Sequence, residues 1–357
     1  MTRLGAVVPA LAVIAALAFA QQTPVFRVGL DMVYVTVTVC DARGGLVSDL
    51  DADDFVVRED ARVQKVQVFG AAAGQVHAGE HAPKTAMLHC TRCCETQHVK
   101  EGDLVAPCPR GHRTFDIGDR EDLSLNLGML FDTSESMRKD LRLSQESAIR
   151  FLDAVPRARD LLLVFFDRDI RLSRYSSENQ QGIFQRILET KGEGFTALYD
   201  AIAVYLSRVA ETPGRKVLVI FTDGDDTTSQ TPPQEVQRMV RSGAAVIYPV
   251  AFPGDQRPGS EAAMRAGAFL QSLADLSGGR VFHPSASREL AAIYQSILDE
   301  LGTQYVLGYV SDNPARDGKF RKINVITSRT GLKLRHRPGY DAPKEEPPKA
   351  AKGAKGN

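Results

Sequence analysis

The chain has 357 residues, of which 43% are hydrophobic and 25% are charged, and this is the composition of a globular protein long enough for two or three domains. Lysine plus arginine and aspartate plus glutamate both number 44, so the net charge is zero. A balanced charge gives no reason to expect nucleic acid or an acidic membrane surface as the partner, which must be inferred from a particular site.

The first twenty residues have the pattern of a secretory signal. Arg3 precedes an apolar run over 4–19, and the small residues Ala18 and Ala20 mark a cleavage site. The run is shorter than the roughly 20 residues that a membrane-spanning helix needs, with an uncleaved anchor as the alternative. We predict a signal peptide over 1–20 and export to the periplasm, the cell envelope or the medium, with no integral membrane span after cleavage.

Residues 25–70 alternate apolar and polar side chains, most clearly from Val33 to Val39, with turn residues at 41–45. A period of two is typical of half-buried strands, so we predict a small N-terminal β domain. Residues 71–119 lose this periodicity, and we predict that they form an insert or a linker.

Four of the five cysteines lie within this predicted insert. Two pairs of ligands at this spacing suit a tetrahedral Zn²⁺ site, which would be structural because four protein ligands leave no open position. Disulfides are the alternative, since an exported protein meets an oxidising compartment. Cys40 lies in a strand-like run and is expected to be an inert packed thiol. The residues of this possible second metal site are Cys90, Cys93, Cys108 and His112, with Cys94, His89 and His98 as substitutes.

Over 120–302, continuous apolar runs alternate with amphipathic helical patterns. Apolar runs without alternation are typical of strands buried on both faces, and helical crossovers imply a parallel sheet. We predict a doubly wound, mostly parallel α/β domain. The expected strands are 123–131, 161–166, 216–222, 244–251 and 279–283, and the expected helices are 138–154, 177–190, 197–210, 233–242, 260–276 and 287–301.

Strand-like alternation returns over 303–341. We expect these C-terminal strands to join the N-terminal ones, so that the two flanks of the α/β domain build one smaller β domain. The tail over 342–357 is rich in lysine, proline, glycine and alanine and is predicted to be disordered.

Oxygen-bearing side chains follow two of the predicted parallel strands and precede one helix. The carboxyl ends of parallel strands meet at one edge of a sheet, where ligands bind. Two carboxylates and three hydroxyls suit a hard cation such as Mg²⁺ (or Mn²⁺/Ca²⁺), and they leave coordination positions for an outside ligand. The predicted ligands are Asp132, Ser134, Ser136, Thr196 and Asp223.

The order and spacing of these five residues resemble the metal ion-dependent adhesion site of von Willebrand factor type A domains, over about 123–301. The resemblance implies that the serines and the threonine bind the metal directly. It also implies that the aspartates often act through water and that an acidic group on a protein partner completes the shell. Glu135 departs from the glycine common at its position, and its charge either favours the cation or crowds the incoming carboxylate.

The flanks strengthen the resemblance. The segment from Val33 to Phe69, which includes 54–60, and the segment from Tyr305 to Tyr340 are similar to a bacterial group of exported proteins that carry a related domain. That likeness implies an architecture and an export route, with no assigned reaction.

Simpler roles exist for each of these side chains taken singly. Serine and threonine often cap helices, and aspartate often holds a turn. Capping gives no reason for five hard-oxygen residues on three loops at one edge, so we favour the metal site. Asp225 and Asp226 are expected to be solvated loop charges.

The predicted function is therefore that of an exported binding protein and not of an enzyme. A structural envelope protein whose metal only stabilises the fold is the alternative. A Mg²⁺-dependent phosphotransferase or phosphatase is less favoured, because it needs a second aspartate where Ser134 stands. A redox role for Cys90 and Cys93 lacks the surrounding strand and helix of thioredoxin-like proteins.

Overall fold

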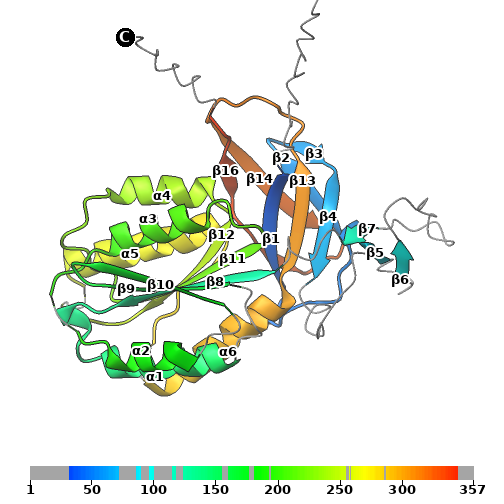
Figure 1. Ribbon diagram of the computed structural model, residues 1–357. Helices are drawn as coiled ribbons and strands as arrows, with labels where there is room; N and C mark the ends of the chain where they lie inside the picture. Colours follow the sequence, from blue (N-terminus) through cyan, green and yellow to red (C-terminus); the bar gives the residue numbers. More distant parts are fainter. Residues whose placement is uncertain are drawn as a thin grey trace, which may run out of the picture. The chain divides into compact units, whose positions relative to one another are not determined.

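A computed structural model describes the chain over residues 32–71, 86–89, 96–99, 115–117, 124–154, 160–176, 181–192, 194–254, 257, 259–284 and 287–344. It contains one five-stranded, mostly parallel sheet with helices on both faces, and two four-stranded antiparallel sheets from the flanking chain (Figure 1). The predicted fold class is confirmed. Within the described part, no helix is both long and apolar enough to cross a membrane.

The five-stranded sheet consists of β8 (Leu125–Asp132), β9 (Asp160–Phe166), β10 (Ile170–Ser176), β11 (Arg215–Thr222) and β12 (Ala245–Ala251). Its order is β10-β9-β8-β11-β12, and only β10 runs antiparallel to its neighbour. β8, β9, β11 and β12 are buried along almost their whole length. Burial on both faces explains why their sequences are apolar without alternation.

Three helices cover each face of this sheet (Figure 1). One core cluster contains Phe131 and Phe221, whose rings stack 4.6 Å apart, and the other contains the fully buried Tyr205. One face carries α1 (Leu141–Ala154), α2 (Gln181–Glu189) and α6 (Ser287–Thr303), and the other carries α3 (Leu198–Val209), α4 (Pro233–Ser242) and α5 (Glu261–Ser277).

The antiparallel sheets form a β-sandwich around a third apolar core. The first has the order β15-β1-β13-β4 and the second β16-β14-β2-β3. In each sheet C-terminal strands pair with N-terminal ones, as expected: β13 lies between β1 and β4, and β14 pairs with β2. The alternation of β1 places Val33, Val35, Val37 and Val39 in this core. The strands are β1 (Met32–Cys40), β2 (Phe55–Glu59), β3 (Arg62–Gln64), β4 (Val66–Ala71), β13 (Tyr305–Val310), β14 (Phe320–Thr327), β15 (Lys333–Arg335) and β16 (Gly339–Asp341).

The local pattern missed several elements. β10 was not predicted, because it follows a polar turn at 167–169 and is an edge strand with only partial burial. The strand expected over 279–283 is reduced to one bridge between Phe282 and Val250. Within the predicted insert, three short strands form an antiparallel sheet: β5 (Ala86–His89), β6 (Thr96–Val99) and β7 (Phe115–Ile117).

Gly128 in β8 gives a test of the core. A Cβ atom at this position would lie 2.0 Å from the ring of Tyr205, which is fully buried and whose hydroxyl donates to the carbonyl of Val217. We expect Gly128→Ala to lower the free energy of unfolding by about 1–3 kcal/mol, as overpacking does. Chemical denaturation measures this. Gly182→Ala on α2 is the control, since nothing lies within 4 Å of its Cβ, and equal losses in the two variants would contradict the clash.

Candidate metal centre

The ends of β8 and β11 bring two of the predicted ligands to one edge of the sheet. The strands are parallel neighbours with Phe131 opposite Phe221, so the residues that follow them leave the sheet side by side. The hydroxyl of Thr222 donates a hydrogen bond of 2.6 Å to Oδ2 of Asp132, and Asp223 comes next in the chain. This edge is the carboxyl edge, where the sequence predicted the site.

A chain of hydroxyls joins the two carboxylates. Oδ1 of Asp132 accepts hydrogen bonds from the backbone nitrogen of Ser134 at 3.0 Å and from its hydroxyl at 2.5 Å. The hydroxyls of Ser134 and Ser136 are 3.1 Å apart, and the hydroxyl of Ser136 in turn hydrogen-bonds to the carboxylate of Asp223. The structure therefore brings four of the five predicted residues into direct contact.

The fifth predicted residue, Thr196, lies on a loop that is bonded to the same site. The carbonyl of Gly194 accepts a hydrogen bond of 3.1 Å from the backbone nitrogen of Glu135. Thr196 itself is only 3% exposed, and its backbone nitrogen donates to the hydroxyl of Thr227 at 2.9 Å. Its side chain takes no part in the hydrogen bonds described above, so the structure places its loop at the site without joining its hydroxyl to the other four.

The contacts argue against helix capping as the role of these hydroxyls. Ser134 precedes a 3-10 turn (Glu135–Met137) without capping it through its side chain. Other residues bond to the first backbone nitrogens of α3. Oδ2 of Asp226 accepts a hydrogen bond of 3.0 Å from the backbone nitrogen of Tyr199, and the hydroxyl of Ser229 accepts one of 3.1 Å from the backbone nitrogen of Asp200. The expectation that Asp226 is a solvated loop charge is therefore wrong, because its carboxylate caps a helix.

Burial dominates the electrostatics of the two carboxylates. Desolvation raises the pKa of Asp132 to about 7, against the hydrogen bonds from Ser134 and Thr222, and the nearby charge of Asp223 raises it further. Burial also raises the pKa of Asp223, and the hydrogen bond from Ser136 opposes this. Oδ2 of Asp223 is buried without a hydrogen-bond partner in the described structure. Two buried acidic groups and an unsatisfied oxygen form a site that a cation would stabilise.

The donor set fits a hard cation. Every side chain in it offers oxygen, and within the described residues neither Asp132 nor Asp223 has an ion pair with a basic side chain. The described residues also contain no group of three or more histidine, cysteine, aspartate or glutamate side chains suited to a metal. The set of two carboxylates and hydroxyls therefore favours Mg²⁺, Mn²⁺ or Ca²⁺ over Zn²⁺.

Glu135, the departure from the family pattern, lies at the surface of the site. Its carboxylate pairs with Arg138 at 3.0 Å, and both side chains are about two-thirds exposed. An exposed ion pair of this kind contributes little to stability, but the positive charge of Arg138 offsets the negative charge of Glu135 beside the candidate site.

The sequence analysis assigned no role to Thr222. Its position at the end of a buried strand, next to Asp223, was the available signal. The hydrogen bond to Asp132 depends on the pairing of β8 with β11, which the local sequence does not specify.

The cysteine cluster is a separate matter. Cys90, Cys93, Cys108 and His112 lie outside the described residues, so zinc and disulfides both remain predictions. Cys40 is a free, partly buried thiol at the end of β1, and burial raises its pKa, as suits an inert position.

A family model of the von Willebrand factor type A domain matches residues 128–225. This chain contains a von Willebrand factor type A domain. A domain of this family suggests a protein-interaction or adhesion-type function. Nothing in the described structure favours the phosphotransferase alternative, because the position of its second aspartate is held by Ser134, whose hydroxyl donates to the carboxylate of Asp132.

A curated relative that carries similar sequence is inter-alpha-trypsin inhibitor heavy chain H4 from Sus scrofa. It is 28% identical over 195 residues, which are 49% of this chain and 20% of that protein. The present chain thus corresponds to about a fifth of that relative.

Three solved structures are among those that resemble part of this chain. A von Willebrand factor type A protein from Catenulispora acidiphila is 12% identical, covers 65% of this chain and 68% of its own, and has a TM-score of 0.42. Proximal thread matrix protein 1 from the mussel byssus is 15% identical, with 50% and 48% covered and a TM-score of 0.39. The pilus adhesin SpaC from Lactobacillus rhamnosus GG is 8% identical, with 62% and 44% covered and a TM-score of 0.43.

The raised pKa of Asp132 predicts a pH-dependent stability without metal. The folded-state value of about 7 exceeds the unfolded value of about 3.9, so the stability associated with its protonation is lost as pH rises between these values. In Asp132→Asn this loss is absent. We expect the stability of the wild type relative to Asp132→Asn to fall by about 2 kcal/mol from pH 5 to pH 7.

Urea unfolding in the presence of a chelator measures this difference. Asp275→Asn, at an exposed position on α5, is the matched control and should follow the pH profile of the wild type. Parallel pH profiles of the free energy of unfolding for the wild type and Asp132→Asn would contradict a raised pKa of Asp132.

Proposed function

We propose that this chain is an exported protein that binds a protein partner through a divalent cation in its von Willebrand factor type A domain. The ligands are Asp132, Ser134, Ser136, Thr196 and Asp223. The observation that carries the proposal is the line of contacts from one buried carboxylate through two hydroxyls to a second buried carboxylate, with no basic side chain among the described residues to neutralise them.

The cation, when bound, supplies a Lewis-acidic position that an outside carboxylate can enter. The protein's own groups prepare that position. The donors from Thr222 and Ser134 hold both oxygens of Asp132, and Ser136 holds the carboxylate of Asp223. Because these groups are already oriented by hydrogen bonds, little ordering is required when the cation binds.

An exposed aromatic side chain beside the site supports a protein partner. Phe195 is 62% exposed, although its neighbour Thr196 is buried. The residues on both sides are held by backbone hydrogen bonds, from Glu135 to Gly194 and from Thr196 to Thr227. An exposed aromatic ring on a backbone that is fixed on both sides is suited to anchor a partner. The partner surface should therefore present an acidic residue next to an apolar one.

Export is part of the proposal because of the signal-like pattern over 1–20, which lies outside the described residues. A metal that only stabilises the fold is the competing outcome, and partner binding separates the two.

Cation binding predicts a stability shift that depends on the site. We expect millimolar Mg²⁺ or Mn²⁺ to raise the melting temperature of the wild type, because a ligand at 100 times its Kd stabilises the folded state by about 2.7 kcal/mol. Ser136→Ala should reduce the shift and Asp132→Ala should abolish it. Ser207→Ala, an exposed hydroxyl on α3, is the control and should keep the full shift. Identical shifts in melting temperature in all four proteins would contradict cation binding at this site.

Partner binding predicts a dependence on metal, on a peptide carboxylate and on Phe195. On an array of matched peptides, binding should require Mg²⁺ and should be lost when the single Asp of a peptide is replaced by Asn. Phe195→Ala should weaken the binding of peptides that carry an apolar residue next to the Asp by roughly tenfold. It should leave the metal-induced shift in melting temperature intact. Val63→Ala, an equally exposed apolar side chain on β3, is the control. A melting shift without chelator-sensitive peptide binding would favour the purely structural metal.

A further inference from the structure

A cavity of about 330 Å³ lies at the edge of the five-stranded sheet opposite the metal centre. It is lined by the C-terminal ends of α3 and α4 and by the first residues of β11 and β12. The metal centre lies where β8 and β11 end, so the two sites are at opposite ends of β11. The cavity is within the size range of small-ligand sites, at its lower limit.

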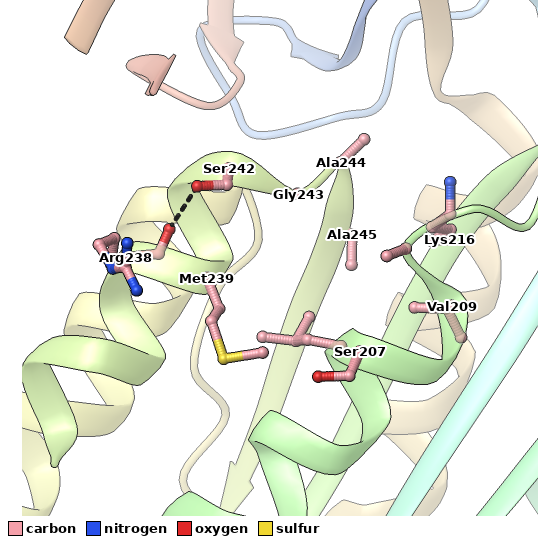
Figure 2. A pocket seen from close by; sticks show the side chains of 11 residues that line it. Ser207, Val209, Lys216, Arg238, Met239, Ser242, Gly243, Ala244 and Ala245 are labelled. Carbon is pink, nitrogen blue, oxygen red and sulfur yellow. Dashed lines mark hydrogen bonds between the residues drawn. The ribbon is translucent and has the colours of Figure 1, made fainter. Parts of the chain in front are cut away.

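The floor of the cavity is apolar. Leu206 and Val209 of α3 and Ala245 of β12 are at most 6% exposed, and Met239 of α4 lies over them. Figure 2 shows the side chain of Met239 directed toward the side of α3 that carries Ser207 and Val209. The groove therefore offers a hydrocarbon surface between two helices.

Most polar groups around this floor already have partners. The hydroxyls of Ser207 and Ser242 donate to carbonyl oxygens of their own helices, at 2.8 and 3.0 Å. Arg337 donates to the carbonyl of Gly243 at 2.6 Å, and Arg238 pairs with Glu235. These groups are thus unavailable to a ligand without breaking an existing bond.

Lys216 is the exception among the lining residues. Its position at the start of β11 leaves it half-buried, and burial alone lowers its pKa, since no carboxylate in the described structure is close enough to pair with it. None of the eleven lining residues is acidic. In Figure 2 its ammonium group stands at the rim beside Ala244 and Ala245, not on the floor. A desolvated cation at the mouth of an apolar groove attracts an anion.

We propose that this groove binds a small amphipathic carboxylic acid, with the apolar chain on the floor between α3 and α4 and the carboxylate at Lys216. The apolar floor selects a hydrocarbon chain, and the unpaired ammonium selects a negative head group over a neutral or positive one. The proposal is independent of the metal centre, because none of its residues contacts the predicted ligands.

The test compares three ligands with the same eight-carbon chain: octanoate, 1-octanol and octylamine. The full chain carries [¹³C-methyl]methionine, and Met239→Leu identifies the resonance of Met239 in the NMR spectrum. We expect octanoate to shift this resonance with saturation and to bind about tenfold more tightly than 1-octanol, with octylamine the weakest. Acetate, which lacks the chain, should not shift it.

Two variants separate the head group from the floor. Lys216→Gln should make octanoate no better than 1-octanol, whereas Arg238→Gln should keep the preference because Arg238 is already paired with Glu235. Ser207→Leu, on the exposed side of α3, should block all three ligands. The proposal is overturned if octanoate leaves the Met239 resonance unchanged, if octylamine binds as well as octanoate, or if the preference survives Lys216→Gln.

Discussion

Burial of the carboxylate of Asp132 is the constraint on which the carboxyl edge of the sheet depends. A carboxylate at the end of a buried strand loses its hydration, and the result is a pKa of about 7. Donors from Ser134 and Thr222 satisfy both of its oxygens but do not neutralise its charge. The neighbouring Asp223 adds a second buried acidic group. A cation at this edge would offset the unfavourable burial of these two acidic groups.

Hydrogen bonds fasten the three loops at that edge to one another. Glu135 is bonded to Gly194, and the carbonyl of Thr196 accepts from the backbone nitrogens of Thr227 and Thr228. Asp226 closes the arrangement by capping α3, the helix that follows Thr196. The backbone on both sides of the exposed Phe195 is therefore fixed by residues of the other two loops.

A second buried charge joins the α/β domain to the β-sandwich. Glu300, near the end of α6, is 2% exposed and pairs with Arg280 and Arg335. The hydroxyl of Tyr248 donates to it at 3.1 Å, and Gln304, just before β13, bonds to the same hydroxyl. Because loss of one partner would leave a charge buried, this cluster strongly couples α6 and β12 to the sandwich strand that carries Arg335. The flanking strands are thus part of the same folded body as the α/β domain.

Periodicity, which is a property of short stretches of sequence, was enough to predict the doubly wound sheet and the β flanks. The strand ends predicted that Asp132 and Asp223 would lie at one edge of the sheet, while the metal site itself stays a prediction. These features were enough because the period of apolar residues reports burial directly, and because parallel strands end at a common edge. Only the tertiary structure decided that Thr222 bonds to Asp132, that Asp226 caps α3 and that Lys216 stands unpaired beside an apolar groove. Each of these depends on which distant segments lie side by side, and strand pairing and helix packing determine that globally, not through the residues nearby in the chain.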